Sequence, residues 1–328
     1  MLLLVANVTG RHSAPATNHF PIKSLPPSPL QPLPHPAATA AGILLYCKRD
    51  DLYTPAPGTA LQGNKVRKLS GFIRAALALA QRPLFMSFGG AFSNHLSALA
   101  TAGRLYGFPV VIFVRGEEAD NPILDQAKSD GAQLIHLSRS EYRLRYDSDW
   151  LNARRTELAA RYGLPVSAVW PIAEGGTCPG SARSVGKLYD EVTTQMGSVA
   201  DYLCISAGTG GSAAGVILAA HPATRIEVFP ALKGDWMTKE IKHFLPVDCG
   251  KNWACVQDYH FGGYGKFPKE WIIASRGRAK IADIGEPGLP PLEPVYTAKL
   301  FYGVLDRVRR GAYPAGSSVV VVHTGGIY

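Results

Sequence analysis

Between residues 84 and 230 the chain alternates short apolar runs with longer amphipathic segments. The runs have the length of buried strands, and they are Leu84–Ser87, Val110–Val114, Gln133–Leu137, Ala168–Ile172, Tyr202–Ser206 and Thr224–Pro230. Such runs, apolar on both faces, are typical of parallel sheets covered by helices on both sides. The sequence therefore predicts an α/β protein with mainly parallel sheets.

Helices are predicted between these runs and near both ends of the pattern. In the first of them Val66, Leu69 and Ile73 recur at helical spacing, and Asn121 with the following proline is a helix-start signal. A strand is expected on either side of this region, at 43–48 and 317–322. The predicted helices cover residues 64–81, 93–105, 121–130, 150–162, 182–196, 211–220 and 297–310.

The first 40 residues are rich in proline, serine and alanine, with Pro26-Pro-Ser-Pro29 and Pro34-His-Pro36 as the densest stretches. Proline fixes φ and lacks an N–H, so this segment is predicted to be extended loop with at most a short turn. The apolar start at residues 1–8 has no basic lead-in and is too short for a secretory signal.

Length and composition argue against a membrane protein, a nucleic-acid-binding protein and a metalloprotein. The chain has 328 residues, enough for two domains, and no apolar run of about 18 residues that would predict a membrane span. The net charge is +9, but the basic residues are scattered, which favours a solvated surface over a nucleic-acid interface. The five cysteines lack metal-ligand spacing, so we expect reduced thiols of a cytoplasmic protein and no metal site.

A glycine-rich segment, Ser206-Ala-Gly-Thr-Gly-Gly-Ser-Ala-Ala-Gly215, lies between a predicted strand and a predicted helix. Glycines allow a tight turn with several N–H groups facing one point, and the dipole of the following helix favours an anion there. The segment lacks the Gly-Lys-Ser/Thr of an ATP-binding loop and the spacing of a dinucleotide site. It predicts a phosphate site, the alternative being a turn that binds nothing.

Two further segments carry polar groups at predicted helix starts. Gly63-Asn-Lys-Val-Arg-Lys68 places Lys65 beside a helix N-terminus with a second cation nearby. Both features destabilise an ammonium, and a lysine that loses its proton suits Schiff-base chemistry, although a solvated surface lysine is the commoner outcome. In Ser87-Phe-Gly-Gly-Ala-Phe-Ser-Asn-His95, Ser93 and Asn94 are either helix caps or ligand contacts.

Taken together, these segments resemble the D-cysteine desulfhydrase / 1-aminocyclopropane-1-carboxylate (ACC) deaminase family. That family belongs to the tryptophan-synthase-β-like, fold type II pyridoxal-phosphate enzymes. The resemblance runs from near Phe20 to Gly326, about nine-tenths of the chain. Its markers are Lys48-Arg-Asp-Asp51, Gly63-Asn-Lys-Val-Arg-Lys-Leu69, Gly89-Gly-x-x-Ser-Asn-His95, Pro294-Val-Tyr-Thr-x-Lys299 and His323-Thr-Gly-Gly326.

The resemblance implies pyridoxal 5′-phosphate as cofactor and assigns roles to individual residues. Lys65 would link covalently to the cofactor and later act as acid or base. Asn94 would bond the cofactor's 3′-oxygen, and Ser93 would lie near the substrate carboxylate or the Cα proton. Tyr264 and Tyr296 match active-site tyrosines, although either could be a packing residue. The residues expected to hold or approach the phosphate are Lys68, Gly208, Thr209, Gly210, Gly211 and Ser212.

The substrate is suggested by two positions expected near the pyridine nitrogen. ACC deaminases of this family have Glu and Leu where this chain has Thr297 and Thr324. A neutral hydroxyl leaves the nitrogen largely unprotonated, which suits α-proton removal and β-elimination. The resemblance therefore favours conversion of a small D-amino acid, D-cysteine above all, to pyruvate, ammonia and hydrogen sulfide. ACC deamination to 2-oxobutyrate, elimination from D-serine, and a non-catalytic cofactor-binding protein stay open.

The resemblance also implies two domains with the cofactor in the cleft between them, and a homodimer. Residues 1–18 would form an N-terminal extension. The larger domain would combine 19–72 with 171–328 and carry Lys65 and the phosphate loop. The smaller domain, 73–170, would carry Ser93. Beyond a small amino acid and a second copy of the chain, neither nucleic acid nor a membrane is expected as a partner.

Overall fold

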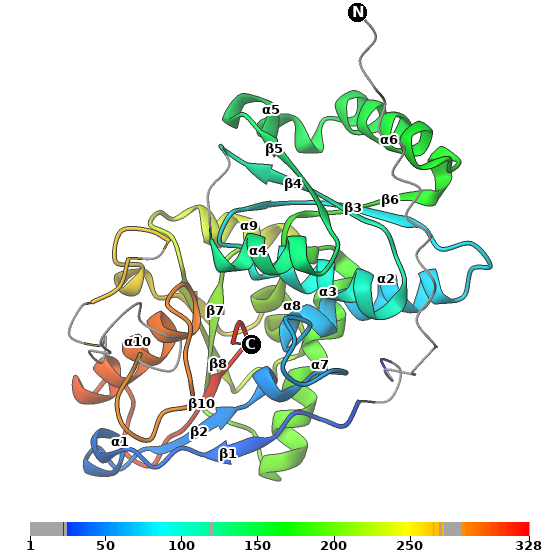
Figure 1. Ribbon diagram of the computed structural model, residues 1–328. Coiled ribbons are helices and arrows are strands. Elements are labelled where there is room, and N and C mark those ends of the chain that lie inside the picture. Colours follow the sequence, from blue (N-terminus) through cyan, green and yellow to red (C-terminus); the bar gives the residue numbers. More distant parts are fainter. Residues whose placement is uncertain are drawn as a thin grey trace, which may run out of the picture.

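Two sheets, lying one above the other with helices between them, organise the protein (Figure 1). The computed structural model describes residues 22, 25–117, 121–264, 266–268, 271 and 284–327. The six-stranded sheet has the order β1 (Leu30–Pro32), β2 (Leu44–Lys48), β10 (Ser318–Val322), β7 (Tyr202–Ala207), β8 (Arg225–Pro230) and β9 (Trp253–Cys255). The four-stranded sheet has the order β5 (Gln133–Leu137), β4 (Val110–Arg115), β3 (Leu84–Gly90) and β6 (Val169–Ile172).

Every pairing of neighbouring strands is parallel except that of β1 with β2. The predicted α/β class is therefore confirmed. Parallel strands end at the same edge of their sheet, so the loops that follow β7 and β10 meet above one edge and those that follow β3 and β4 above another. Those edges are where ligands bind in folds of this kind.

The prediction of a proline-rich loop up to residue 40 was wrong for its last part. β1 is an edge strand that ends at Pro32, a place where a missing N–H is tolerated. Helix α1 (Pro36–Ala40) begins with proline in its first turn, where that N–H would have no partner, and the His35 ring accepts from the Ala37 N–H. The predicted extension at 1–18 lies outside the described residues.

Alternating side chains of the six-stranded sheet face two different helical layers. In β10, Val319 and Val321 pack with α1 and α10 (Thr297–Arg309), whereas Val320 and Val322 pack on the opposite face. All four are buried, which explains the uniformly apolar run. The helices of the second layer are α7 (Pro179–Met196), α8 (Gly211–Ala219) and α9 (Trp236–Phe244).

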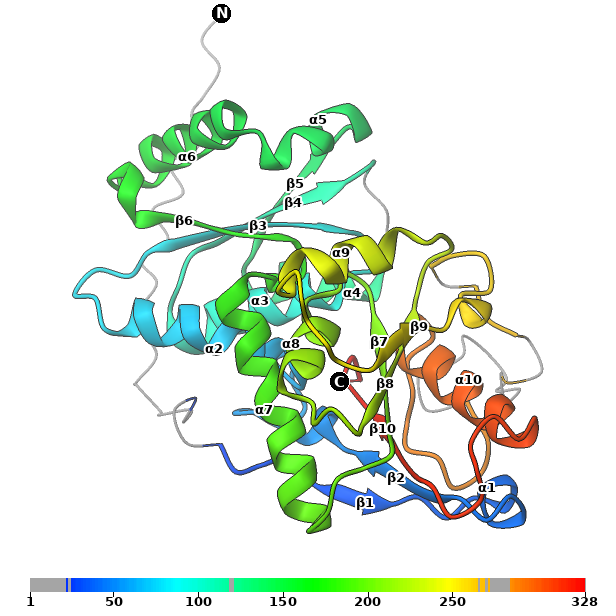
Figure 2. The same cartoon turned by 180° about the vertical axis from the view of Figure 1, so that it is seen from behind.

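The four-stranded sheet is likewise covered on both faces, as both views show (Figures 1 and 2). Its face toward the other sheet packs against α2 (Asn64–Leu77), α3 (Asn94–Tyr106) and α4 (Pro122–Ser129). The outer face packs against α6 (Ser148–Tyr162) and the short α5 (Arg139–Arg143). Neither α5 nor α9 was predicted, and α2 is shorter than expected because it ends at Leu77.

Helix α2, which carries Lys65, shares its apolar core with the four-stranded sheet. Val66, Leu69 and Ile73 pack in the same cluster as Phe85 and Ile112 of that sheet. The strands of this sheet all lie within residues 84–172. The boundaries between domains at residues 72 and 170 stay a prediction.

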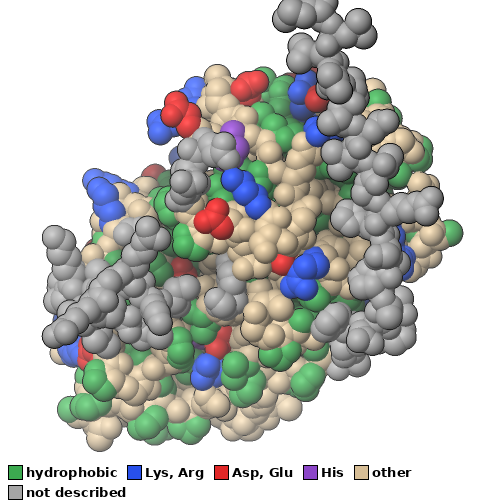
Figure 3. All heavy atoms as spheres, viewed as in Figure 1, with side chains coloured by type: hydrophobic (Ala, Val, Ile, Leu, Met, Phe, Trp, Pro, Cys, Tyr) green, Lys and Arg blue, Asp and Glu red, His purple; other side chains and the backbone are tan. Residues whose placement is uncertain are grey.

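Charged side chains of both signs are interspersed over the face of the molecule seen in Figure 3, so the net positive charge is not concentrated there. In the described part of the chain, no helix is long and apolar enough to cross a membrane. Nor do histidine, cysteine and acidic residues gather there into a group that could hold a metal ion.

A buried network of charged residues, here called the Arg67 network, joins α2 to β2 and α7. The Arg67 guanidinium donates to both oxygens of Asp50 at 3.0 and 3.1 Å and to Glu191 at 2.7 and 2.8 Å. Lys48 forms an ion pair with Glu191 at 2.8 Å. The side chains of Arg67, Asp50 and Lys48 are at most 2% exposed. Two cations therefore balance two carboxylates, of which Asp50 is buried and Glu191 is 15% exposed.

We expect Arg67→Met to lower the free energy of unfolding by about 3–5 kcal/mol, because it leaves the buried Asp50 and the partly exposed Glu191 with only Lys48 to neutralise them. Urea unfolding followed by circular dichroism measures the change. The matched control is Arg310→Ala, which removes an exposed pair with Asp306 and should cost less than about 1 kcal/mol. Equal effects of the two substitutions would contradict the stabilising role of the network.

Candidate active site

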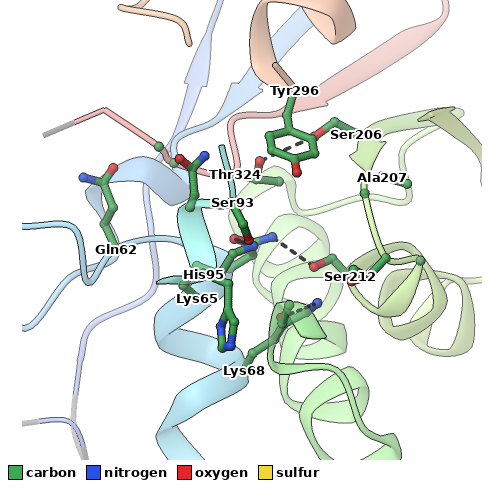
Figure 4. A pocket seen from close by; sticks show the side chains of 18 of the residues that line it. Gln62, Lys65, Lys68, Ser93, His95, Ser206, Ala207, Ser212, Tyr296 and Thr324 are labelled. Carbon is green, nitrogen blue, oxygen red and sulfur yellow. Dashed lines mark hydrogen bonds between the residues drawn. The ribbon is translucent and has the colours of Figure 1, made fainter. Parts of the chain in front are cut away.

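A pocket between the two sheets brings together most of the predicted site residues (Figure 4). Its walls come from α2, the loop before α3, the loop between β7 and α8, and the segment after β10. The predicted residues that line it are Lys65, Lys68, Ser93, Asn94, Gly208, Thr209, Gly210, Ser212, Tyr296 and Thr324. Those that do not line it are Gly211, Tyr264 and Thr297.

The first turn of α2 is fixed against both neighbouring loops. Gly63 has φ of 59°, and a Cβ there would collide with the carbonyl oxygen of Thr324, so only glycine fits. The Asn64 N–H donates to that carbonyl at 3.3 Å, and its side-chain amide donates to the Ser212 hydroxyl at 3.0 Å. These bonds hold Lys65 at the pocket wall, with its Nζ 3.2 Å from the Asn64 side-chain oxygen.

Burial makes the two pocket lysines easy to deprotonate. It lowers the pKa of Lys65 to about 8, although the charge of Glu293 opposes the change. Burial and the nearby Lys65 charge also hold the pKa of Lys68 well below its usual value. Lys68 donates to the Gly175 carbonyl at 3.2 Å and to the Thr177 hydroxyl at 2.9 Å. In the described part of the chain, the Lys65 ammonium donates to the Asn64 side-chain oxygen and to no backbone carbonyl.

The loop before α8 forms a backbone cradle. No side chain caps the helix N-terminus, where Gly210 has φ of 75°. A Cβ on Gly208 would come within 2.8 Å of the Tyr296 ring, and one on Gly211 would collide with Thr177. The Thr209 hydroxyl lies 2.8 Å from that of Thr177. An uncapped helix start with glycines packed this closely suits a phosphate.

The loop after β3 supplies Ser93 and Asn94. Ser93 is the N-cap residue of α3, yet its hydroxyl makes no capping bond and is available to a ligand. The Asn94 amide nitrogen lies 2.5 Å from the position that a Cβ on Gly326 would occupy, so the α3 start and the C-terminal segment touch. Both residues line the pocket where the prediction placed them.

His95 also lines the pocket, and sequence reasoning gave it no role. The Ser87 hydroxyl donates to the Ile172 carbonyl at 2.8 Å, so it must accept from His95 Nε2, also at 2.8 Å. Nε2 therefore carries a proton, and Nδ1 is buried without a hydrogen-bond partner in the described part of the chain. Burial and the two lysine charges lower its pKa well below the ordinary value.

Two tyrosines stand at the other side of the pocket. Tyr296 lines it, and the Tyr264 ring packs edge-on against Tyr296 with the centroids 6.1 Å apart. Burial raises the pKa of both hydroxyls, which stay protonated and able to donate at neutral pH. Tyr264 thus contacts Tyr296 and does not itself line the pocket.

The two threonines expected near the cofactor ring have different positions. Thr324 lines the pocket, with its hydroxyl 3.5 Å from that of Ser206. Thr297 is fully buried; its hydroxyl accepts from the Glu293 N–H at 2.9 Å and donates to the Glu293 carbonyl at 3.3 Å. A local turn at the start of α10 thus uses the Thr297 hydroxyl, and the cofactor contact expected of this residue stays a prediction.

Several lining residues were missed by the sequence reasoning. Four of them lie within the family markers, which could have indicated them: Asn64, His95, Gly325 and Gly326. The missed lining residues are Ala60, Gln62, Asn64, His95, Gly175, Ser206, Ala207, Gly325 and Gly326.

The donor set fits pyridoxal phosphate. A lysine whose pKa is about 8 stands in the same pocket as an uncapped, glycine-rich helix start, which matches an aldehyde and a phosphate on one small molecule. Residues 23–234 match the sequence profile described as pyridoxal-phosphate dependent enzyme. A relative from Pyrococcus abyssi is 30% identical and aligns over 94% of this chain and 93% of its own.

The chain belongs to the pyridoxal-phosphate-dependent enzymes. A protein of Burkholderia vietnamiensis named 1-aminocyclopropane-1-carboxylate deaminase is 28% identical over 92% of either chain. The crystal structure of an ACC deaminase homologue superposes with a TM-score of 0.72 at 27% identity, covering 92% of this chain and 89% of the other. A threonine deaminase from Solanum lycopersicum, 17% identical with a TM-score of 0.59 over 94% and 82%, shares the fold.

We expect covalent attachment of pyridoxal phosphate to the apoenzyme to accelerate with pH up to about 8 and then level off. The neutral amine reacts, and the lowered pKa of Lys65 makes it half populated near pH 8, where less than about 1% of an ordinary lysine is neutral. Growth of an absorbance band near roughly 410–420 nm measures the rate.

The control for this measurement is Lys65→Ala, which should show no band at any pH. Circular dichroism across the same pH range checks that the apoenzyme stays folded. A rate that keeps rising up to pH 10 would contradict the lowered pKa of Lys65.

Proposed function

We propose that the enzyme eliminates a β substituent from a small amino acid, with D-cysteine as the preferred substrate. The observation that carries this proposal is the absence of aspartate and glutamate among the residues that line the pocket in the described part of the chain. At the ends of β10 and β7 the pocket has the hydroxyls of Thr324 and Ser206 in place of a carboxylate. A neutral partner for the pyridine nitrogen favours loss of a β leaving group over more demanding carbanion chemistry.

In this proposal the cofactor, when bound, supplies the electron sink, and the chain supplies position and proton transfer. Lys65 would hold the cofactor covalently, and its amine, once released, would take the Cα proton and pass it to the departing sulfur. A base whose pKa is about 8 is close to the optimum for proton transfer at physiological pH.

The remaining residues bind and orient. The N–H groups at the start of α8, with Thr209 and Ser212, hold the phosphate, and Lys68 adds charge on its own side of the pocket. Ser93 and Asn94 face the substrate carboxylate and the cofactor's oxygen at the start of α3. Water completes the reaction, since cysteine plus water balances pyruvate, ammonia and hydrogen sulfide.

The second candidate is ACC deamination to 2-oxobutyrate and ammonia. It is favoured by the relatives, because the Burkholderia vietnamiensis protein and the crystal structure of the homologue carry this activity in their names. Their identity to this chain is 28% and 27%, a range in which pocket residues change. The products separate the two reactions.

The proposal predicts that the purified holoenzyme releases pyruvate and sulfide from D-cysteine at least about tenfold faster than from L-cysteine, a difference of about 1.4 kcal/mol in activation free energy. Parallel assays with D-cysteine, L-cysteine, D-serine and ACC measure both 2-oxo acids. Lys65→Ala serves as the inactive control. Faster formation of 2-oxobutyrate from ACC would overturn the D-cysteine assignment and favour the second candidate.

Tyr296→Phe should lower kcat by about 10²-fold or more without removing the cofactor's absorbance band, because the variant loses one positioned proton donor. Tyr264→Phe is the matched control and should have a smaller effect, since Tyr264 does not line the pocket. Steady-state kinetics and the absorbance spectrum together make the test. A larger loss for Tyr264→Phe would reverse the roles of the two tyrosines.

A further inference from the structure

A second cavity, of about 360 Å³, lies outside the active-site pocket. It is lined by Arg115, Arg139, Tyr142, Arg143 and Arg145, and is called the arginine cavity below. Four of its five lining residues are cations, in a chain whose other basic residues are scattered. The reaction described above uses none of them.

The arginine cavity lies at the edge of the four-stranded sheet where ligands are expected. Arg115 is the last residue of β4, and α5, with Arg139 and Arg143, follows β5 after a single residue. Arg145 lies in the next turn, η2 (Leu144–Tyr146). The carboxyl ends of β3, β4 and β5 lie side by side, and β3 leads to Ser93, so this edge also carries part of the active site.

The positive charge of the cavity is only partly neutralised. Arg145 pairs with Glu174 at 3.1 Å. In the described part of the chain, Arg115, Arg139 and Arg143 form no ion pair of the kind that Arg145 makes. Glu141, on the same helix, is bonded to the Ser138 hydroxyl at 2.7 Å. Guanidinium groups around one cavity repel one another, and a bound anion would relieve that repulsion.

Tyr142 gives a second, independent indication of a ligand. The residue is 2% exposed, and its hydroxyl is buried without a hydrogen-bond partner in the described structure. The Glu174 carboxylate interacts with this hydroxyl from beyond the distance of a close hydrogen bond. Burial and this carboxylate raise the pKa of Tyr142, so the hydroxyl keeps its proton and can donate. The guanidinium carbons of Arg145 and Arg115 lie 4.6 and 5.8 Å from its ring. A buried donor left without a partner is uncommon and fits an acceptor from outside the chain.

The cavity adjoins the active site on two sides. A Cβ on Gly90 would lie 3.5 Å from an Arg115 nitrogen, and the Gly90 carbonyl accepts from the Ser93 N–H. On the other side, Glu174, the partner of Arg145, precedes Gly175, whose carbonyl accepts from Lys68. Two arginines of the cavity therefore lie next to the loop that carries Ser93 and the loop that anchors Lys68.

We propose that the arginine cavity is a binding site for small carboxylates beside the substrate side of the active site. The cavity would capture an amino acid by its carboxylate before the amino acid enters the active-site pocket, and this role rests on the proposed function. The binding of an anion does not depend on that function. Charge that attracts a substrate to a cleft raises the rate of productive encounter. Free inorganic phosphate has negatively charged oxygens like those of a carboxylate. It is the alternative ligand, and the experiment below distinguishes it from a carboxylate.

The test is calorimetric titration of the holoenzyme at low salt with propionate, with propionamide as the uncharged analogue, and with inorganic phosphate. Arg139→Gln/Arg143→Gln changes two exposed residues of the cavity. Arg309→Gln/Arg310→Gln removes the same charge at the far end of α10 and is the matched control. We expect propionate but not propionamide to bind, about tenfold more weakly to the cavity variant and unchanged to the control.

Each other outcome overturns the proposal. Absence of propionate binding, or equal binding by the cavity variant, would show that the arginine cavity holds no carboxylate. Binding of phosphate without propionate would exclude the carboxylate assignment. An equal loss in the control variant would indicate a general effect of net charge. Because the titration needs no turnover, it stands even if D-cysteine and ACC both prove not to be substrates.

Discussion

The Arg67 network is the constraint on which the geometry of the site depends. Asp50 follows β2, Glu191 lies in α7, and Arg67 lies two residues after Lys65, so one set of ion pairs joins the six-stranded sheet, a covering helix and the lysine helix. Buried charges are costly unless paired with good geometry. A displacement of α2 would break several of these bonds at once, and the position of Lys65 is fixed accordingly.

The same turn of α2 holds cations of two kinds, one that keeps its charge and two that lose a proton easily. Lys65, Arg67 and Lys68 place three cations within four residues, and all three are largely removed from water. Arg67 keeps its charge because its guanidinium does not lose a proton in proteins and two carboxylates meet it. The two lysines face the pocket, and burial lowers the pKa of each. The arginine therefore carries the structural charge, and the lysines, on the face of the helix toward the pocket, carry the reactive amines.

Sequence reasoning succeeded where periodicity or glycine carries the information. The buried strands and the glycine-rich loop before α8 belong to such patterns, whereas Tyr296 and Thr324 were selected only by the family resemblance. Helix α5 was missed because its five residues, Arg139–Arg143, show no apolar periodicity, and its capping box is too short a signal alone. The local bonds of Thr297 could not be predicted either, since a hydroxyl that bonds two groups of Glu293 looks no different in sequence from one that faces a ligand.

Glu293 links this local turn to the chemistry of the pocket. Its carboxylate accepts from the N–H groups of Val295, Tyr296 and Thr297 at 2.7 to 2.8 Å, and so caps the start of α10. The carboxylate is close enough for its charge to act on Lys65, yet its bonds direct it toward the helix. The cap therefore keeps a carboxylate near the amine without offering it to a ligand in the pocket, where Thr324 presents only a hydroxyl. Tyr296 lies within this turn, and the turn holds its ring against Gly208.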